Sequence, residues 1–507
     1  MRKYFLILVL FFTSQSVILA QDVTVLTLDE SINIALKESF TIKSIKQLVY
    51  SAERNLWAAK AGYRTYALSK ISAPVYDEGF RLVEVVNGNP VPKQYGSFQV
   101  KGNLDIIQPM PWIPFGGGSL TFRAEGYQLN SWTPSPLNPG VDLKSNQFYT
   151  SLSAIINKPL FTINQLKLGL KQAELNYERQ SKVFKRSELD LVYRVTMSFY
   201  QLYRRTQEVK INQEKVERQK MIYETTRKKY EAGLAAEVEA MQAEVELVQY
   251  KNELKASESR KKEQEEAFKQ LIGLPLSQDI TVITELEVKP VYVDVDQAVN
   301  LALKNRSEIV EKMIDIEEQK IQIKQIDAQV SVKGNLRGYY RFSGFSDPDL
   351  PYGTPTGDLF NDSWDVLRRT PNRGVTFELE IPIWDWGKNK AQVQAAQASL
   401  ERQQLTLNDT YTTITREVRD VVRSVYETYD RVMMLEKSKA VSEKSFDINM
   451  QRYQNGDITT TELARANDQL NTAKLSYLSA YIEYKLALAD LQRKTLYDFE
   501  NKKSLVE

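Results

Sequence analysis

The most constraining feature of the sequence is a proline-to-glycine stretch that occurs twice, from Pro159 to Gly233 and from Pro382 to Gly456. The glycine follows the proline by 74 positions in both copies, and no other proline lies between them. Read as one helix at ~1.5 Å per residue, each stretch is about 110 Å long. That length far exceeds an ordinary globular helix, so neighbouring helices must hold it.

Both stretches carry apolar residues at coiled-coil spacing. In the second copy they lie four and three apart, with one extra step of four, at Leu407, Tyr411, Ile414, Val418, Val421, Val425, Tyr429 and Val432. The first copy has a similar rhythm at Val192, Val195, Phe199 and Leu202. The glycine of each Tyr-x-x-Gly motif suits a left-handed helix end. We therefore predict a turn there and returning helices over about 237–272 and 461–495.

Each half of the chain opens with a shorter helix and then changes to a period of two. Asp29 and Asp296 are the predicted N-caps of helices of roughly 35 residues that end near Tyr63 and Val330. Alternating apolar and polar residues then predict strands, and Val-Lys-Gly-Asn-Leu occurs in both halves. The alternating segments are 98–106, 120–125, 330–337 and 375–381. Alternation alone leaves open a membrane-spanning sheet or a half-buried soluble sheet.

Composition favours the membrane interpretation. Five of the six tryptophans lie in or beside the strand segments: Trp112, Trp132, Trp364, Trp384 and Trp386. Aromatic residues at strand ends are typical of membrane barrels, and turn-forming residues predict exposed loops at 87–90 and 346–349. The first strand segment is 44 residues longer than the second, enough for an extra hairpin around 98–129. We estimate roughly four membrane strands per chain, which leaves the count in the longer segment open.

The bulk composition excludes several classes of function. The 507 residues carry a formal net charge of +2 and include no Cys and no His. Balanced charge argues against a nucleic-acid partner. The missing residue types exclude disulfides, thiolate chemistry, histidine catalysis and ordinary zinc sites. We predict no catalytic, cofactor-binding or metal-binding residues. The basic start and apolar run of residues 1–20 predict a signal peptide for export.

The pattern divides the chain into two structural repeats, 21–290 and 291–507. Each repeat holds a strand segment (about 64–158 and 330–381) and a long helical hairpin (about 159–273 and 382–496). Four strands cannot close a barrel, and open sheet edges do not occur in a bilayer. The barrel must therefore be shared between subunits, with eight strands from a dimer or twelve from a trimer.

The duplicated plan, the strand–helix junctions Lys158-Pro159-Leu160-Phe161 and Ile381-Pro382-Ile383-Trp384, and the Tyr-x-x-Gly tips resemble the TolC-like outer-membrane efflux proteins. The resemblance covers essentially the whole chain after the signal. It implies a fold of mixed α and membrane β: a trimeric, twelve-stranded β-barrel in outer-membrane lipid, plus a coiled-coil α-barrel tunnel in the periplasm. It also implies a homotrimeric, non-enzymatic export channel of a tripartite efflux or type I secretion system. Such a channel is a passive conduit that docks to a periplasmic adaptor and an inner-membrane pump.

The resemblance further implies a gate beside the second tip. In relatives, acidic residues six and nine positions after the tip glycine ring the periplasmic entrance. Glu462 occupies the first of these positions, Arg465 occupies the second, and Asp457 is an alternative source of the missing charge. Three Glu462 carboxylates would repel one another, prefer cations and favour opening. The alternative role for Glu462 is that of a solvated helix residue.

Two more sets of tip residues follow from the resemblance. Tyr453 and Glu239 match positions that tie the tips closed in relatives, but Ile458 replaces the basic partner. We interpret Tyr453, like Tyr230, as a packing residue rather than a catalytic one. The tip positions that meet the adaptor correspond to Gly233, Leu234 and Gly456, whose alternative role is turn formation alone.

Other classes of function remain open at this point. An exported coiled-coil scaffold or adhesin would place the strands in a soluble domain, and detergent dependence separates it from a channel. An enzyme would need a carboxylate pair, and none stands out from the charged helix faces. The sequence does not identify the cargo, although scarce Met and absent His argue against a dedicated relay for soft metal ions.

Overall fold

The computed structural model describes residues 24–83, 91–114, 116–135, 141–284, 287–367 and 371–505. The predicted signal peptide at 1–20 and the predicted loop at 87–90 lie outside these residues. The chain divides into two compact units. Unit 1 comprises residues 1–47, 183–309 and 409–507, and unit 2 comprises residues 48–182 and 310–408.

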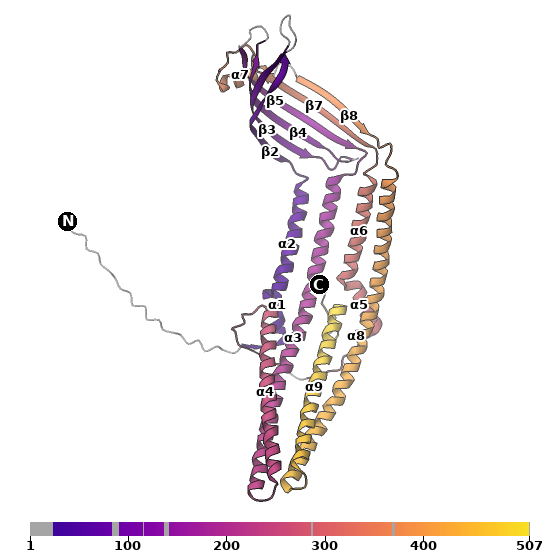
Figure 1. Cartoon of the computed structure of the whole chain (residues 1–507). Coiled ribbons are helices and arrows are strands. Elements are labelled where there is room, and N and C mark those ends of the chain that lie inside the picture. Colours follow the sequence, from indigo (N-terminus) through magenta and orange to yellow (C-terminus); the bar gives the residue numbers. More distant parts are fainter. Residues whose placement is uncertain are drawn as a thin grey trace, which may run out of the picture. The chain divides into compact units, whose positions relative to one another are not determined.

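Helices follow the same order in both halves of the chain (Figure 1). The first half has α1 (Leu28–Glu38), α2 (Phe40–Ala61), α3 (Gln165–Glu231) and α4 (Glu237–Ile272). The second half has α5 (Val295–Asn305), α6 (Ser307–Asp327), α7 (Thr356–Val366), α8 (Lys388–Asn455) and α9 (Thr460–Thr495). Only α7, which lies between two strands, has no counterpart among the described residues of the first half. None of the described helices is both long and apolar enough to cross a membrane.

Unit 2 is built on one antiparallel sheet of six described strands, in the order β2-β3-β4-β5-β7-β8 (Figure 1). The strands are β2 (Tyr66–Val83), β3 (Val91–Pro109), β4 (Ser119–Pro134), β5 (Asp142–Leu160), β7 (Lys333–Phe345) and β8 (Pro371–Glu380). The estimate of roughly four strands is therefore wrong. The first segment contributes four strands because the extra hairpin expected around 98–129 is present as β3 and β4.

The shared motif Val-Lys-Gly-Asn-Leu is not structurally equivalent in the two halves. We call the end of the sheet where β2 begins after α2 the helix end. The first motif (100–104) lies in β3, which runs toward the helix end, whereas the second (332–336) opens β7, which runs away from it. Strand direction instead makes β2 the counterpart of β7, and β5 the counterpart of β8. The hairpin β3–β4 is the insertion.

The long helices confirm the predicted coiled-coil seams. Helix α3 has 67 residues and α8 has 68, so each is about 100 Å long. The central seam residues are buried: Val195, Phe199 and Leu202 in α3, and Ile414, Val418, Val421, Val425 and Val432 in α8. The returning helices α4 and α9 begin and end within one residue of their predicted bounds. In unit 1, one apolar core includes Phe199, Phe268 and Tyr481 from α3, α4 and α9.

Neither proline begins its long helix. Pro159 lies inside β5, Pro382 follows β8, and α3 and α8 each begin six residues later. The side chain of Asn164 accepts a backbone hydrogen bond of 3.0 Å at the start of α3. Asp385 accepts two such bonds, of 2.9 and 3.0 Å, at the start of α8. Polar side chains downstream of the prolines therefore satisfy the first helical N–H groups.

The predicted N-caps of the opening helices are also wrong, by two residues each. Helix α1 is capped by Thr27, whose hydroxyl accepts from the Glu30 N–H while the Glu30 carboxylate accepts from the Thr27 N–H. Helix α5 is capped by Asp294, not Asp296. Asp29 and Asp296 lie in the first helical turn, where a negative charge still favours the positive end of the helix dipole.

Each opening helix is interrupted rather than continuous over 35 residues. The breaks are at Ser39, between α1 and α2, and at Arg306, between α5 and α6, and both residues have extended backbone. Ser39 is buried, and Gly273 lies so close that a Cβ there would be 2.5 Å from the carbonyl oxygen of the residue before Ser39. Arg306 forms ion pairs of 2.7 Å with Glu308 and Glu417. Tertiary contacts therefore accompany both breaks.

Short strand pairs complete unit 1. Strands β1 (Thr24–Leu26) and β6 (Ile280–Val282) pair in parallel, and β9 (Tyr497–Asp498) and β10 (Lys503–Ser504) pair antiparallel. The β1–β6 pair joins the start of the described chain to the segment after α4.

Candidate functional site

One face of the six-stranded sheet is apolar, and we call it the apolar face. Directly opposed residues of antiparallel strands lie on the same face, so the register assigns every strand position to a side. Its exposed residues include Ile71, Val100, Leu104, Ile106, Phe122, Leu152, Ile156, Val375, Phe377 and Leu379. Ile71 and Val375, on the two edge strands, are each 76% exposed. On β3 the apolar positions run from Phe98 to Ile106, the length of a tilted membrane strand.

The opposite face is polar, and we call it the polar face. Arg123 binds Asp105 through two hydrogen bonds of 2.6 and 2.8 Å. Lys101 lies 3.0 Å from Glu125. These ion pairs join β3 to β4, the two strands of the inserted hairpin. A sheet with an exposed apolar face and a charged face fits lipid on one side and water on the other.

Aromatic residues lie at both ends of the sheet. Trp112, Trp384 and Trp386 are exposed at the helix end. At the other end, Trp132 lies near the end of β4, and Trp364 lies on α7, which packs against β5 and β7. The distribution matches the aromatic girdles at the two interfaces of a membrane barrel.

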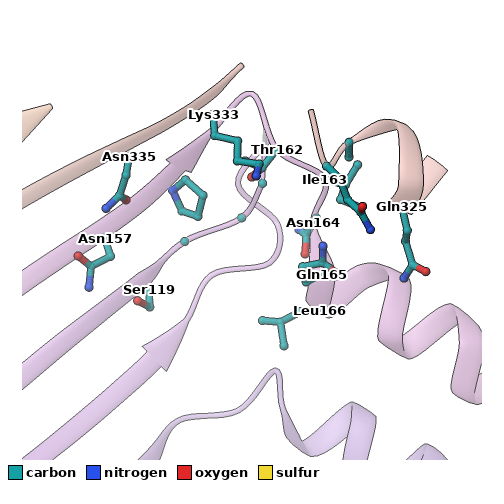
Figure 2. A pocket seen from close by; sticks show the side chains of 16 residues that line it. Ser119, Asn157, Thr162, Ile163, Asn164, Gln165, Leu166, Gln325, Lys333 and Asn335 are labelled. Atoms are coloured by element: carbon teal, nitrogen blue, oxygen red, sulfur yellow. The ribbon is translucent and has the colours of Figure 1, made fainter. Parts of the chain in front are cut away.

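A cavity of about 570 Å³ opens at the helix end of the sheet (Figure 2). Its strand residues belong to the polar face: Ser119, Asn157, Lys333 and Asn335. Asn164, Gln165 and Gln325 line it from the helices α3 and α6 or just before them (Figure 2). Gly116 has a φ of +101°, and a Cβ there would lie 2.5 Å from the hydroxyl of Thr162. The lining therefore offers mainly amide and hydroxyl groups for hydrogen bonding.

The two hairpin tips in unit 1 have the same backbone geometry. Gly233 has a φ of +70°, its N–H donates to the Tyr230 carbonyl at 2.8 Å, and the Leu234 N–H donates to the carbonyl five residues earlier at 2.7 Å. Gly456, with a φ of +87°, and Asp457 repeat these two bonds at 3.1 and 2.9 Å. This pattern is the Schellman-type helix end expected of a glycine in the left-handed conformation.

The tyrosines of the two tips differ. Tyr230 is 40% exposed, whereas Tyr453 is 4% exposed. The Tyr453 hydroxyl shares a hydrogen bond of 2.6 Å with Thr226 and accepts one of 3.5 Å from Thr460. Lys229 donates to the Tyr453 carbonyl at 2.8 Å and lies 4.3 Å from the ring centroid. Tyr453 of the second hairpin is therefore fixed against α3 of the first.

Further polar contacts join the hairpins farther from the tips. The guanidinium of Arg218 on α3 donates to Asn467 at 2.8 Å and to Asn471 at 2.6 Å, both on α9. Burial lowers the pKa of Arg218. Lys474 on α9 donates to Glu214 on α3 at 2.9 Å. In the part of the chain that the structure describes, no group of three or more His, Cys, Asp or Glu residues forms a metal site.

The sequence profile of the outer membrane efflux protein family matches residues 135–274 and 366–495, together just over half of the chain. The chain belongs to the outer membrane efflux protein family. The efflux protein is thus an outer-membrane protein that acts in efflux, and it is not an enzyme. The TolC-like resemblance is confirmed. No curated protein sequence matches the chain at a significant level.

Solved channels share the fold of the efflux protein. The CmeC outer membrane channel of Campylobacter jejuni is 13% identical, with a TM-score of 0.67 over 95% of this chain and 87% of CmeC. The outer membrane protein VceC of Vibrio cholerae is 15% identical, with a TM-score of 0.64 over 93% and 97%. The open state of the MtrE outer membrane channel of Neisseria gonorrhoeae is 14% identical, with a TM-score of 0.63 over 92% and 88%. At such identities the likeness concerns the fold.

In the efflux protein, Glu462 has a local role that the sequence analysis missed. Its carboxylate accepts from the Thr459 N–H at 2.9 Å, and its own N–H donates to the Thr459 hydroxyl at 3.3 Å. This reciprocal capping box stabilises the start of α9. The backbone and hydroxyl hydrogen bonds of Thr459 hold the pKa of Glu462 below its usual value of 4.5, and Arg452 and Arg465 lower it further.

The structure brings some of the predicted tip residues together and separates others. Asp457 is exposed in the turn, and Glu239 lies half-buried in the first turn of α4. The hydroxyl of Tyr453 bonds threonines rather than Glu239. Leu234 lies in the turn that connects α3 to α4, and its side chain is 78% exposed.

The residues that join the two hairpins were not predicted. Thr226, Lys229 and Arg218 lie on α3, and each contacts the second hairpin more than 200 positions away in sequence. Each is an ordinary polar residue in a helix rich in polar residues. The sequence carries no local signal for such contacts. These polar residues can be recognised as contact residues only in the folded chain, where they meet side chains and backbone of the second hairpin.

Proposed function

We propose that the efflux protein is a homotrimeric outer-membrane export channel that forms the passive exit duct of a tripartite efflux or type I secretion system. The sheet is the observation that supports this proposal: one face is exposed and apolar, and the other is charged. Among the described residues, neither edge strand, β2 nor β8, pairs with a further strand. In lipid, free sheet edges leave backbone groups unpaired at several kcal/mol each. Pairing of the edges with other copies removes that cost and places the charged faces around a water-filled lumen.

The helices of unit 1 support the same assembly. Helix α4 exposes an apolar stripe at steps of three and four through Val238, Met241, Val245 and Val248. Helix α8 exposes a second stripe at steps of seven through Met434, Val441 and Ile448. Exposed stripes at heptad spacing are the seams of coiled coils. We propose that each stripe packs against a neighbouring copy of the chain, so that three copies form a closed helical tunnel.

The tips are the proposed docking surface for a periplasmic adaptor. Gly233 and Gly456 hold the turns, and Leu234 places an exposed apolar side chain at the first tip. The adaptor in turn would link the tunnel to an inner-membrane pump that supplies the energy. We also keep the division into two repeats, 21–290 and 291–507, as part of this proposal, because the order of helices recurs across it.

The gate of the channel is proposed at Glu462, with Asp457, Tyr453 and Glu239 as its further residues. A ring of three Glu462 carboxylates would attract cations and favour opening through mutual repulsion. Glu462→Ala should weaken cation preference and lower the open probability. Because Glu462 also caps α9, Glu462→Gln is the cleaner change: it removes the charge and keeps a capping side chain.

Reconstitution into planar bilayers tests the proposed function. We expect discrete conductance steps from the wild-type protein and a reduced cation preference, from the reversal potential in a salt gradient, for Glu462→Gln. An unchanged reversal potential would remove Glu462 from the gate. A mature protein that is monodisperse without detergent and never conducts would overturn the channel and favour an exported scaffold.

A further inference from the structure

The number of strands in each chain determines how wide a shared barrel is. The family resemblance implied twelve strands from three copies, which requires four strands per chain. The described residues form six strands in one sheet. The additional pair is the hairpin β3–β4, residues 91–134, inserted between β2 and β5. The described residues of the second half form no equivalent, since β7 pairs directly with β8.

The hairpin is built as an integral part of the sheet. Backbone pairing extends from Gly96↔Trp132 to Pro109↔Ser119 within the hairpin. It continues to β2 on one side and to β5 on the other over most of their length. The apolar and polar faces also continue across it: Leu104 and Phe122 are exposed on the apolar face, and Asp105 binds Arg123 on the polar face. The hairpin therefore carries the same two-sided pattern as the membrane strands beside it.

The two free edges are compatible with each other. Strand β2 runs away from the helix end, and β8 runs toward it. A β8 edge placed beside the β2 edge of another copy is thus antiparallel, as throughout the sheet. Alternate positions on both edges, Ser69 and Ile71 on β2 and Val375 and Phe377 on β8, belong to the apolar face. Pairing can therefore keep lipid on one side around the whole barrel.

We infer that β2 of each copy pairs with β8 of the next, so that three six-stranded sheets close into one barrel of eighteen strands. This inference rests on the homotrimer of the proposed function. Barrel diameter grows roughly linearly with strand number, so this barrel is about 1.5 times as wide as one of twelve strands. Barrels of 16–18 strands leave an aqueous channel. The β3–β4 hairpin therefore helps to set the diameter of the barrel, and with it the size of the molecules that can leave through it.

Disulfide trapping between copies tests the pairing. The chain has no cysteine, so we would combine Ser69→Cys on β2 with Val375→Cys, Phe377→Cys or Leu379→Cys on β8, and oxidise the protein in detergent. The matched control replaces Ser69→Cys with Phe122→Cys, which lies on the same face but on an interior strand. We expect covalent dimers and trimers, and nothing larger, for at least one edge pair and none for the control.

Excision of residues 91–134 tests the width. The deletion joins the residues after β2 to those before β5, and these two strands run in opposite directions as a hairpin requires. Electron cryomicroscopy should count eighteen strands in the wild type and twelve in the deletion variant. Polyethylene glycols of intermediate size, added at the exit side, should lower the conductance of the wild type but not of the variant. If the deletion variant does not fold, the cysteine pairs and the strand count of the wild type still test the eighteen-stranded barrel.

The outcomes separate this inference from the function on which it rests. A conducting trimer with a strand count other than eighteen, or with no covalent link for any edge pair, would overturn the inference and leave the channel intact. A wild-type protein that neither trimerises nor conducts would overturn both.

Discussion

The two hairpin tips carry the same motif but hold their tyrosines in different environments. Both end in Tyr-x-x-Gly, and both glycines adopt the left-handed conformation with the same pair of backbone hydrogen bonds. Tyr230 nevertheless stays 40% exposed, whereas Tyr453 is buried against Thr226 and Lys229 of the other hairpin. The backbone geometry of a tip follows from its local sequence, while the role of its tyrosine depends on which helix lies beside it.

The difference also gives the predicted residues of the two tips different expected roles. The proposed tie at Tyr453 joins one hairpin to the other within a single chain, through α3. The first tip has an exposed leucine and an exposed tyrosine instead. We therefore expect the second tip to govern opening and the first tip to present an apolar surface. Four comparisons between the tips can test this division.

Truncation of the tyrosines should give the largest difference. Tyr453→Ala removes a buried ring and should reduce the free energy of local opening at the second tip by about 2–4 kcal/mol. The matched change, Tyr230→Ala, should cost less than about 1 kcal/mol because the ring is partly exposed. Native-state hydrogen exchange of the amides around each tip measures both values. Equal losses at the two tips would show that burial of Tyr453 does not stabilise its hairpin.

Changes to the glycines should instead affect both tips alike. Gly233→Ala and Gly456→Ala each place a Cβ on a left-handed backbone, which costs about 1–2 kcal/mol. Neither Cβ would meet another atom within 4 Å, so backbone strain is the only expected cause. The same hydrogen-exchange experiment provides the measurement. A loss confined to one glycine would contradict the equivalence of the two turns.

Removal of the tyrosine hydroxyl alone tests the tie. Tyr453→Phe keeps the ring but leaves Thr226 and Thr460 without this partner, which should cost about 0.5–1.5 kcal/mol. In planar bilayers we expect this variant to open more often than the wild type. Tyr230→Phe is the control and should behave as the wild type does. If Tyr453→Phe opens no more often, the hydroxyl is only a packing contact.

Acidification should have the smallest effect of the four, and of the two tips it should affect only the second. The hydrogen bonds of Thr459 lower the folded-state pKa of Glu462, so their stabilisation is present above the unfolded-state value of about 4.5. It is lost as the pH falls through the lower folded-state pKa. Protection of the first amides of α9 should decrease over that range in the wild type and not in Glu462→Gln. An identical decrease in the variant would assign the effect to another group.

The two long helical hairpins could be predicted from the sequence almost entirely. Seam residues such as Val418 and Phe199 are buried as their spacing predicted, and the tip glycines end their helices as expected. Helix periodicity, turn glycines and alternating strands are local patterns, so they can be recognised without knowledge of distant neighbours. The same locality explains why the two-faced sheet was anticipated from strand alternation.

The tertiary structure decided the features that depend on distant residues. The strand count, the orientation of the two Val-Lys-Gly-Asn-Leu copies and the breaks at Ser39 and Arg306 follow from pairing and packing across the chain. So do the contacts of Tyr453 and Arg218 with the opposite hairpin. The sequence determined the long helices, their turns and the alternating segments that became β3, β4, β7 and β8, because short-range sterics and periodic burial specify them. Which strands are neighbours, and which polar side chains meet, depends on the free energy of the whole assembly of segments.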